Sequence, residues 1–202
     1  MATIGLDSLY YATITENPTT GEETYGTPKQ LAKAISAEVS IEVAEAILYA
    51  DDGPAEVVKE FKSGTLTLGV DDISAEVAAD LVGAVVDKNK VLVSTSEDGG
   101  APVAIGFRAR KANGTYRYFW LYKVRFAVPT ASLTTKGDSI EFSTPEIEGT
   151  ILRRTKPDPS GKHPWKVETT EGEAAKTITD AWFNTVYEPA YTTTTTTTGS
   201  GN

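Results

Sequence analysis

The chain has 202 residues, 40% hydrophobic and 23% charged, which is ordinary for a globular protein of one domain with appendages. It has no cysteine and one histidine, His163, which excludes a disulfide framework, a thiolate metal site and a site of several imidazoles. Residues 1–87 carry 16 acidic and four basic side chains, whereas residues 88–202 carry 12 acidic and 15 basic ones. The whole chain has a net charge of −9, which argues against direct binding of nucleic acid, because phosphates bind to positive surfaces.

Residues 9–15 are aromatic and β-branched, and they predict a strand that ends in a polar loop over residues 16–28. The clearest alternation follows over residues 35–43, where period two predicts a strand with one buried and one wet face. The buried face is expected to hold Ile35, Ala37, Val39, Ile41 and Val43. The wet face is expected to hold Ser36, Glu38, Ser40 and Glu42.

Residues 44–61 give a mixed signal that fits either a broken helix or an extended excursion. The run Asp51-Asp52-Gly53-Pro54 predicts a turn in either case. Turn formation explains the two aspartates, and a loop calcium site is the alternative. Alternation resumes over residues 63–70 and predicts another strand.

A helix is predicted over residues 74–82, because its apolar residues recur at helical spacing. Asp72 or Ser74 would be its N-cap, and Gly83 lies near its end. Asp71 and Asp72 can also be read as a catalytic acid pair. Adjacent strand residues point to opposite faces, however, and helix capping explains the pair without catalysis.

Residues 103–126 predict the central hairpin, because Asn113-Gly114 separates two β-favouring runs and is typical of a two-residue turn. The expected pairs are Val103 with Val124, Ile105 with Tyr122, Phe107 with Trp120, and Ala109 with Tyr118. This register makes one face continuous, apolar and aromatic. We therefore interpret the aromatic residues as core, and a surface that stacks sugars or bases is the alternative.

The opposite face of this hairpin is expected to carry five cations. They are Arg108, Arg110, Arg117, Lys123 and Arg125. Arg110 would stand across from Arg117, and facing like charges destabilise a strand pair. We therefore expect acidic partners from elsewhere in the chain or from another copy.

Further strands are predicted over residues 90–95, 139–154 and 165–169. Pro145 and Gly149 should bend the second of these or confine it to a sheet edge. Residues 174–187 have the spacing of a helix. The predicted fold is mainly β with α+β character: a β-sandwich or partly closed barrel, with one main flanking helix and a second, short C-terminal helix.

We assign this domain to residues 1–191 and expect the threonine-rich residues 192–202 to be a disordered tail, because they bring no apolar side chains to bury. A glycosylated stalk is the alternative for this tail. No motif supports an enzyme. The sequence has no Gly-x-Ser-x-Gly motif to supply a serine nucleophile for His163, and it has no phosphate-binding loop or dinucleotide-binding fingerprint. We expect no catalytic residue, metal or cofactor.

Several segments together resemble the major tail proteins of long-tailed, siphovirus-type bacteriophages. They are MATIGLDSLYYATIT, residues 43–61 more loosely, TLTLGVDD, EDGGAPVAIGFRARKANGTYRYFWLYKVRF, GDSIEFSTPEIEGTILRR and GKHPW. The resemblance spans about residues 2–189. It implies a tail-tube subunit that forms hexameric rings, which stack into a hollow tube through which DNA passes without specific binding. Some members of the family carry a further immunoglobulin-like domain, and we expect none after the threonine tail here.

The resemblance also implies partners: other copies of the chain and the tape-measure, tail-terminator and tail-tip proteins. Residues 44–61 would stack on the next ring. The candidates for this contact are Tyr49, Asp51, Asp52, Gly53 and Pro54. We expect Ser36, Glu38, Ser40 and Glu42 to line the lumen, and the five hairpin cations to lie at subunit contacts.

We expect a virion protein that is made in the bacterial cytoplasm, since no signal peptide or membrane span is visible. The alternative function is a monomeric β-sandwich module that binds a carbohydrate or protein. A hydrolase with a carboxylate pair ranks last.

Overall fold

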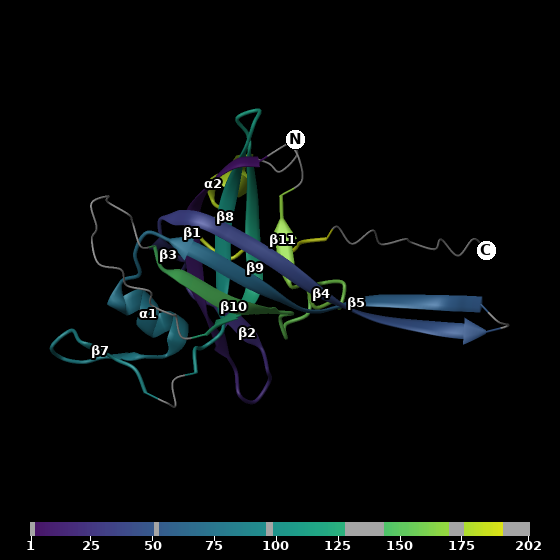
Figure 1. The fold of residues 1–202 in the computed structure, drawn as a ribbon, viewed down its shortest axis with the longest axis horizontal. Coiled ribbons are helices and arrows are strands. Elements are labelled where there is room, and N and C mark those ends of the chain that lie inside the picture. The colour runs from purple at the N-terminus through teal and green to yellow at the C-terminus, as the bar shows by residue number, and fades with distance from the viewer. Residues whose placement is uncertain (1–2, 51–52, 96–98, 128–143, 170–175, 192–202) are drawn as a thin grey trace, which may run out of the picture.

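The computed structural model describes residues 3–50, 53–95, 99–127, 144–169 and 176–191. Its main feature is an antiparallel sheet with the strand order β2-β1-β8-β9-β10-β5-β4 (Figure 1). In this order the strands are Glu23–Tyr25, Thr3–Glu16, Val103–Lys111, Tyr116–Phe126, Glu146–Leu152, Gly53–Val70 and Ala34–Ala50. The remaining elements are β3 (Lys29–Ala32) on β1, β11 (Lys166–Glu168) on β9, the pair β6 (Val85–Val86) and β7 (Leu92–Val93), and helices α1 (Ala75–Val82) and α2 (Lys176–Asp180). The predicted mainly-β class is confirmed, and the sheet does not close into a barrel.

β1 is longer than the predicted strand over residues 9–15. It is irregular near Ser8, whose φ is 55°, and its register on β8 shifts between Asp7 and Tyr10. The predicted loop over residues 16–28 contains β2, which pairs with the end of β1. The prediction missed β2 because its three residues are too short to show a period.

The turn of the central hairpin holds three residues rather than the predicted two. Lys111 N donates to Thr115 O at 2.9 Å, and Gly114 N donates to Lys111 O at 3.0 Å. Gly114 has a φ of 83°, the left-handed conformation that closes a three-residue loop. Asn113-Gly114 therefore marks the turn correctly and gives the wrong loop length.

The extra loop residue shifts the strand register by one position. The observed pairs include Ile105 with Leu121, Phe107 with Phe119, Arg108 with Tyr118, Ala109 with Arg117 and Arg110 with Tyr116. A second irregularity restores the predicted pair of Val103 and Val124. Arg110 and Arg117 do not face each other, so the expected repulsion does not arise.

This shift places apolar side chains on both faces of the hairpin, and each face belongs to a different core. Ile105 and Leu121 are fully buried in the first core, which α1 covers. Trp120 and Tyr122 are fully buried in the second core, on the other face. The interpretation of these aromatic residues as core is confirmed, whereas the prediction of a single apolar face was wrong.

The second core is covered by the segment 176–191, which we call the C-terminal strap. Trp182 packs into this core with only 3% of its surface exposed. Trp120 Nε1 donates to the Trp182 carbonyl at 3.1 Å, and Tyr122 Oη donates to the Tyr187 carbonyl at 2.8 Å. The strap is thus bonded to the sheet through its main chain.

The second predicted helix is shorter than expected, because α2 ends at Asp180 and turns follow. In these turns Trp182 N donates to Thr179 O and Asn184 N to Ala181 O. Carbonyls that would continue a helix bond to sheet side chains instead. No helix in the described ranges is long and apolar enough to cross a membrane.

α1 begins and ends as predicted. Ser74 is its N-cap, and Gly83 ends it in the left-handed conformation with a φ of 79°. Asp72 is therefore not the cap. Asp71 Oδ1 accepts a hydrogen bond from Lys33 N at 2.9 Å, which ties the start of α1 to the start of β4. Neither aspartate caps the helix, so the explanation of the pair by capping was wrong; Asp72 Oδ1 accepts a hydrogen bond from Ile73 N at 2.8 Å.

β4 and β5 continue beyond the rest of the sheet as a two-stranded projection (Figure 1). We call residues 43–50 and 53–60 the arm. Its strands occupy most of residues 44–61, so the extended alternative for this segment is correct and the helical one is wrong. The arm is thin because nothing else in the described chain pairs with either strand there.

Candidate functional surface

The described residues contain no group of three or more His, Asp or Glu side chains arranged to hold a metal ion. His163 is exposed in the loop between β10 and β11. The unusual feature of the fold is instead the outer part of the sheet, where β4 is an edge strand over its whole length.

The predicted wet face of β4 is exposed, and the strand register extends it over β5 and β10. The rows across these three strands are Ser36–Gly69–Glu146, Glu38–Thr67–Glu148 and Ser40–Thr65–Thr150. Side chains directly opposite in antiparallel strands lie on the same face. We call the exposed members of this surface the acidic face: Ser36, Glu38, Ser40, Glu42, Glu146, Glu148 and Thr150.

The sequence did not single out Glu146 and Glu148. The alternation of Glu146, Ile147 and Glu148 indicates a strand with one wet face, but it does not say which strand lies beside it. The pairing of β10 with β5 brings these carboxylates into the row of Glu38.

Most of the carboxylates on the acidic face have no counter-ion. Glu42 is bonded to Lys62 Nζ and Ser63 Oγ, both at 3.3 Å. Within the described part of the chain, the side chains of Glu38, Glu146 and Glu148 make no ion pair or hydrogen bond. The face therefore presents uncompensated negative charge to whatever lies in front of it.

The reverse side of β4 is exposed, which contradicts the prediction of a buried face. Ile35 and Val43 are each 53% exposed, and Val39 and Ile41 are 38% and 37% exposed. Of the five residues predicted for this face, Ala37, opposite Leu68, packs against the first core, as does Ala34 at the start of β4. Alternation shows which residues share a face, but burial needs a layer over that face, and the described residues cover only the part of it near Ala34 and Ala37.

The arm exposes apolar side chains on both of its faces. Val57 and Val58 are consecutive, so they point to opposite sides, and they are 48% and 45% exposed. Lys59 and Glu45 form an ion pair at 3.2 Å across the strands. Of the predicted stacking residues, Tyr49 is paired with Pro54 and Gly53 with Ala50 near the end of the arm.

Asp51 and Asp52, the remaining stacking candidates, lie outside the described residues, as does the calcium alternative that rested on them.

Three of the five predicted contact cations are paired within the subunit. Arg108 binds Asp7 through two nitrogens, and this raises the pKa of Arg108. Arg117 Nη2 lies 2.7 Å from Glu168 Oε1.

The third of these cations, Lys123, binds Glu23, whose side chain is 0% exposed. Glu23 Oε2 also accepts hydrogen bonds from Thr155 N at 2.7 Å and Lys156 N at 3.2 Å. Burial alone would raise the pKa of Glu23, but the bonds from Lys123, Lys156 and Thr155 outweigh it and lower the pKa. This cluster fixes β2 to β9 and to the segment after β10.

The other two cations, Arg110 and Arg125, are exposed and have no partner among the described residues. Arg125 is opposite Thr150, at the edge of the acidic face. Of the five predicted cations, these two are therefore the ones that could still form an ion pair with another subunit.

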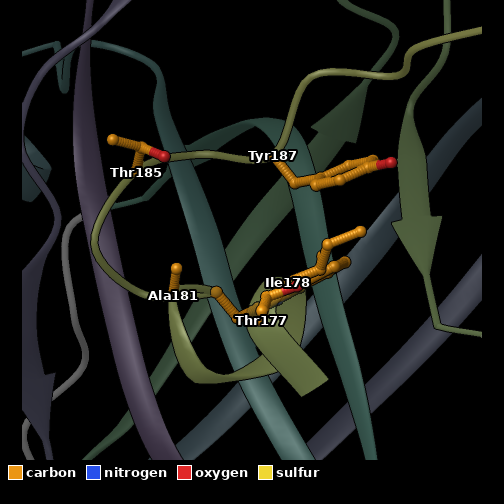
Figure 2. A pocket seen from close by; sticks show the side chains of 6 residues that line it. Thr177, Ile178, Ala181, Thr185 and Tyr187 are labelled. Atoms are coloured by element: carbon orange, nitrogen blue, oxygen red, sulfur yellow. The ribbon is translucent and has the colours of Figure 1, made fainter. Parts of the chain in front are cut away.

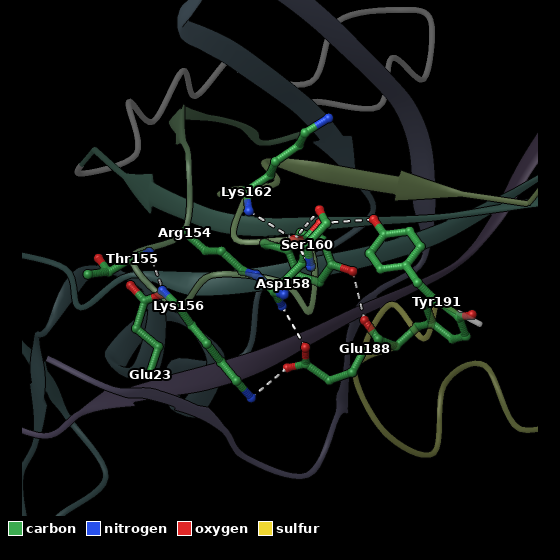
Figure 3. Close-up of polar contacts among 11 residues, drawn as sticks. Glu23, Arg154, Thr155, Lys156, Asp158, Ser160, Lys162, Glu188 and Tyr191 are labelled. Carbon is green, nitrogen blue, oxygen red and sulfur yellow. Dashed lines mark hydrogen bonds and ion pairs between the residues drawn. The ribbon is translucent and has the colours of Figure 1, made fainter. Parts of the chain in front are cut away.

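A second polar cluster holds the end of the strap (Figure 3). Glu188 lies between Arg154 and Lys156, with distances of 2.7 Å and 3.2 Å. Arg154 is fully buried and its guanidinium lies 4.5 Å from the centre of the Tyr122 ring. The strap is therefore part of the folded body.

A pocket of about 270 Å³ opens on the strap (Figure 2). It is lined by Thr177, Ile178, Ala181, Trp182, Thr185 and Tyr187. No charged side chain lines it, so it can hold only a small, largely apolar group.

No protein-family model matches the chain, and no curated protein matches it significantly.

Proposed function

We propose that this chain is the repeating subunit of a phage tail tube, which assembles with other copies through β4 and the arm and conducts DNA along its acidic face. The observation that supports this most is β4: a long edge strand that pairs only with β5 among the described strands and leaves most of its large apolar side chains exposed. A soluble chain rarely leaves such an edge open, because it pairs readily with other strands.

The energetics of β4 and the arm favour association. A two-stranded ribbon is marginally stable in water without a packed face. Ile35, Val39, Ile41 and Val43 are between 37% and 53% exposed. Covering them would stabilise an assembly by about 1 kcal/mol for each side chain. Copies of the same chain can supply this cover repeatedly.

The acidic face suits the wall of a DNA conduit. Glu38, Glu146 and Glu148 repel phosphates and offer them no place to bind. The remaining acidic-face residues are small hydroxyl side chains and the paired Glu42. A wall of this kind guides DNA by weak repulsion rather than by contact.

The strap pocket supports the second candidate function, a monomeric binding module. Tyr187 stacks there on the buried Trp182 with ring centres 5.1 Å apart, so the half-buried Tyr187 ring rather than Trp182 can contact a small, largely apolar group. We rank it below the tube subunit because its walls offer few polar groups to orient a ligand.

The test is the oligomeric state of the purified chain, measured by size-exclusion chromatography with light scattering and by negative-stain microscopy over a concentration series. We expect rings or tubes, and we expect Ile41→Asp to remain folded but monomeric. Ile178→Asp is the matched control, since Ile178 is 39% exposed and lies on the strap rather than on β4. A parent chain that stays monomeric at every concentration refutes the proposal.

The conduit is tested in infectious particles that carry Glu38→Lys with Glu148→Lys. We expect tubes that assemble and release DNA more slowly, most of all at low salt, where screening is weakest. Glu22→Lys is the control because Glu22 is exposed on another part of the chain. Release kinetics equal to the parent at every ionic strength would mean that the acidic face is not in the path of DNA.

A further inference from the structure

The β6–β7 hairpin is a small, well-defined structure that stands apart from both cores. Val85 pairs with Val93 and Val86 with Leu92. Asp87 fixes its turn: Oδ1 accepts hydrogen bonds from Asn89 N at 2.8 Å and from Val91 N at 2.9 Å. Asp87 N also donates to Val91 O at 2.9 Å.

The apolar side chains of this hairpin are exposed although its backbone is fixed. Val85 is 62% exposed, Val91 55%, Val93 45% and Leu92 37%. Val85 and Val93 share a face because they are directly opposite. A fixed apolar surface of this kind indicates a contact site, because exposing apolar side chains to water is unfavourable.

The charges around the hairpin and the arm are complementary. Lys88 and Lys90 lie at the tip of the hairpin, are exposed, and have no partner in the described ranges. The arm carries Glu60, which also has none, beside the exposed Val57 and Val58. An apolar strip with free cations thus exists in the same molecule as an apolar strip with a free carboxylate.

The hairpin and the arm lie at opposite ends of the long axis of the molecule (Figure 1). Two copies that join arm to hairpin therefore leave one free arm and one free hairpin. Such a head-to-tail contact does not end at a dimer, because each added copy leaves a free arm and a free hairpin for the next one.

We propose that the β6–β7 hairpin is the receiving surface for the arm of a second copy. Val85 and Val93 would meet Val58 of the arm, and Lys88 and Lys90 would meet Glu60, which lies on the same face as Val58. This inference rests on the proposed function, which states that copies associate through the arm. It adds the surface that the arm would contact on the second copy.

Cross-linking tests the contact directly, since the chain has no cysteine of its own. Val58→Cys and Val93→Cys are purified separately, mixed and oxidised, and the products are separated on a non-reducing gel. We expect a disulfide-linked dimer from the mixture only. Val58→Cys mixed with Ala112→Cys is the control, because Ala112 is exposed in the β8–β9 turn.

The outcomes separate this inference from the proposed function. Rings or tubes that cross-link to Ala112→Cys, or only between two Val58→Cys chains, overturn the receiving surface and leave the tube subunit standing. Rings or tubes without any cross-link also overturn it. The absence of assembly overturns both.

A charge reversal gives an independent readout. Lys90→Glu should raise the protein concentration needed for assembly by roughly tenfold at low salt, because it places like charges at the contact. Lys162→Glu changes charge equally at an exposed loop site and should leave that concentration unchanged. Equal shifts for the two variants would overturn the contact.

Discussion

Glu23→Gln removes a buried negative charge that has three hydrogen-bond donors. Lys123 Nζ, Thr155 N and Lys156 N all bind this carboxylate, and Lys123 itself is only 14% exposed. A buried pair that loses one partner typically costs 3–5 kcal/mol, and the remaining exposure of Lys123 together with Glu16 at 4.0 Å reduces this. We expect a loss of about 3 kcal/mol in the free energy of unfolding.

Urea unfolding followed by tryptophan fluorescence measures this difference, at a protein concentration where the chain is monomeric. Glu22→Gln is the matched control, because it makes the same chemical change one residue away at an exposed side chain. It should shift the free energy by less than about 0.5 kcal/mol. If the two variants unfold alike, the buried carboxylate does not hold β2 against β9.

The contribution of Glu23 to the free energy of unfolding should depend on pH. The pKa of Glu23 is lower in the folded protein than its ordinary value of 4.5, so the folded state binds fewer protons there than the unfolded state. The stability that Glu23 provides is therefore fully present above pH 4.5 and is lost as the pH falls through its folded pKa. The gap between parent and Glu23→Gln should narrow below pH 4.5, and a gap that widens there would refute the assignment.

Three further substitutions test the packing of the body, each by urea unfolding. Trp182→Ala should cost about 3–5 kcal/mol because Trp182 fills the second core, and a cost below 1 kcal/mol would mean that the strap is not part of the fold. Gly149→Ala should cost about 1–3 kcal/mol, since its Cβ would lie 2.7 Å from Val124 Cγ1; an unchanged midpoint would contradict this contact. Ser74→Ala should cost about 1 kcal/mol through loss of the α1 cap, with Ser74→Asp expected to restore it.

The local features of the fold were predictable from the sequence. Ser74 and Gly83 bound α1 as expected, because capping depends on a few neighbouring residues. Asn113-Gly114 located the central turn for the same reason. The register was not predictable, because one extra loop residue reverses which face each side chain joins, and nothing local distinguishes the two loop lengths.

The candidate surface was only half predictable. The wet face of β4 followed from alternation, and Ser36, Glu38, Ser40 and Glu42 are exposed. Glu148 joins them only because β10 lies beside β5, a pairing between distant parts of the chain. The exposure of Ile41 was missed because alternation shows an apolar face without showing what covers it.

The arm and the body of this chain are completed at different times during synthesis. The arm is a local hairpin whose strands are complete by Val70, whereas Asp7 must wait for Arg108, 101 residues later, and the second core must wait for Trp182. Local strand pairs form quickly, and distant pairs form slowly. On the ribosome the adhesive edge therefore exists well before the body that carries it can fold. Under the proposed association through β4 and the arm, neighbouring nascent chains on one messenger would meet through their arms first, and premature pairing would then compete with assembly of the folded subunits.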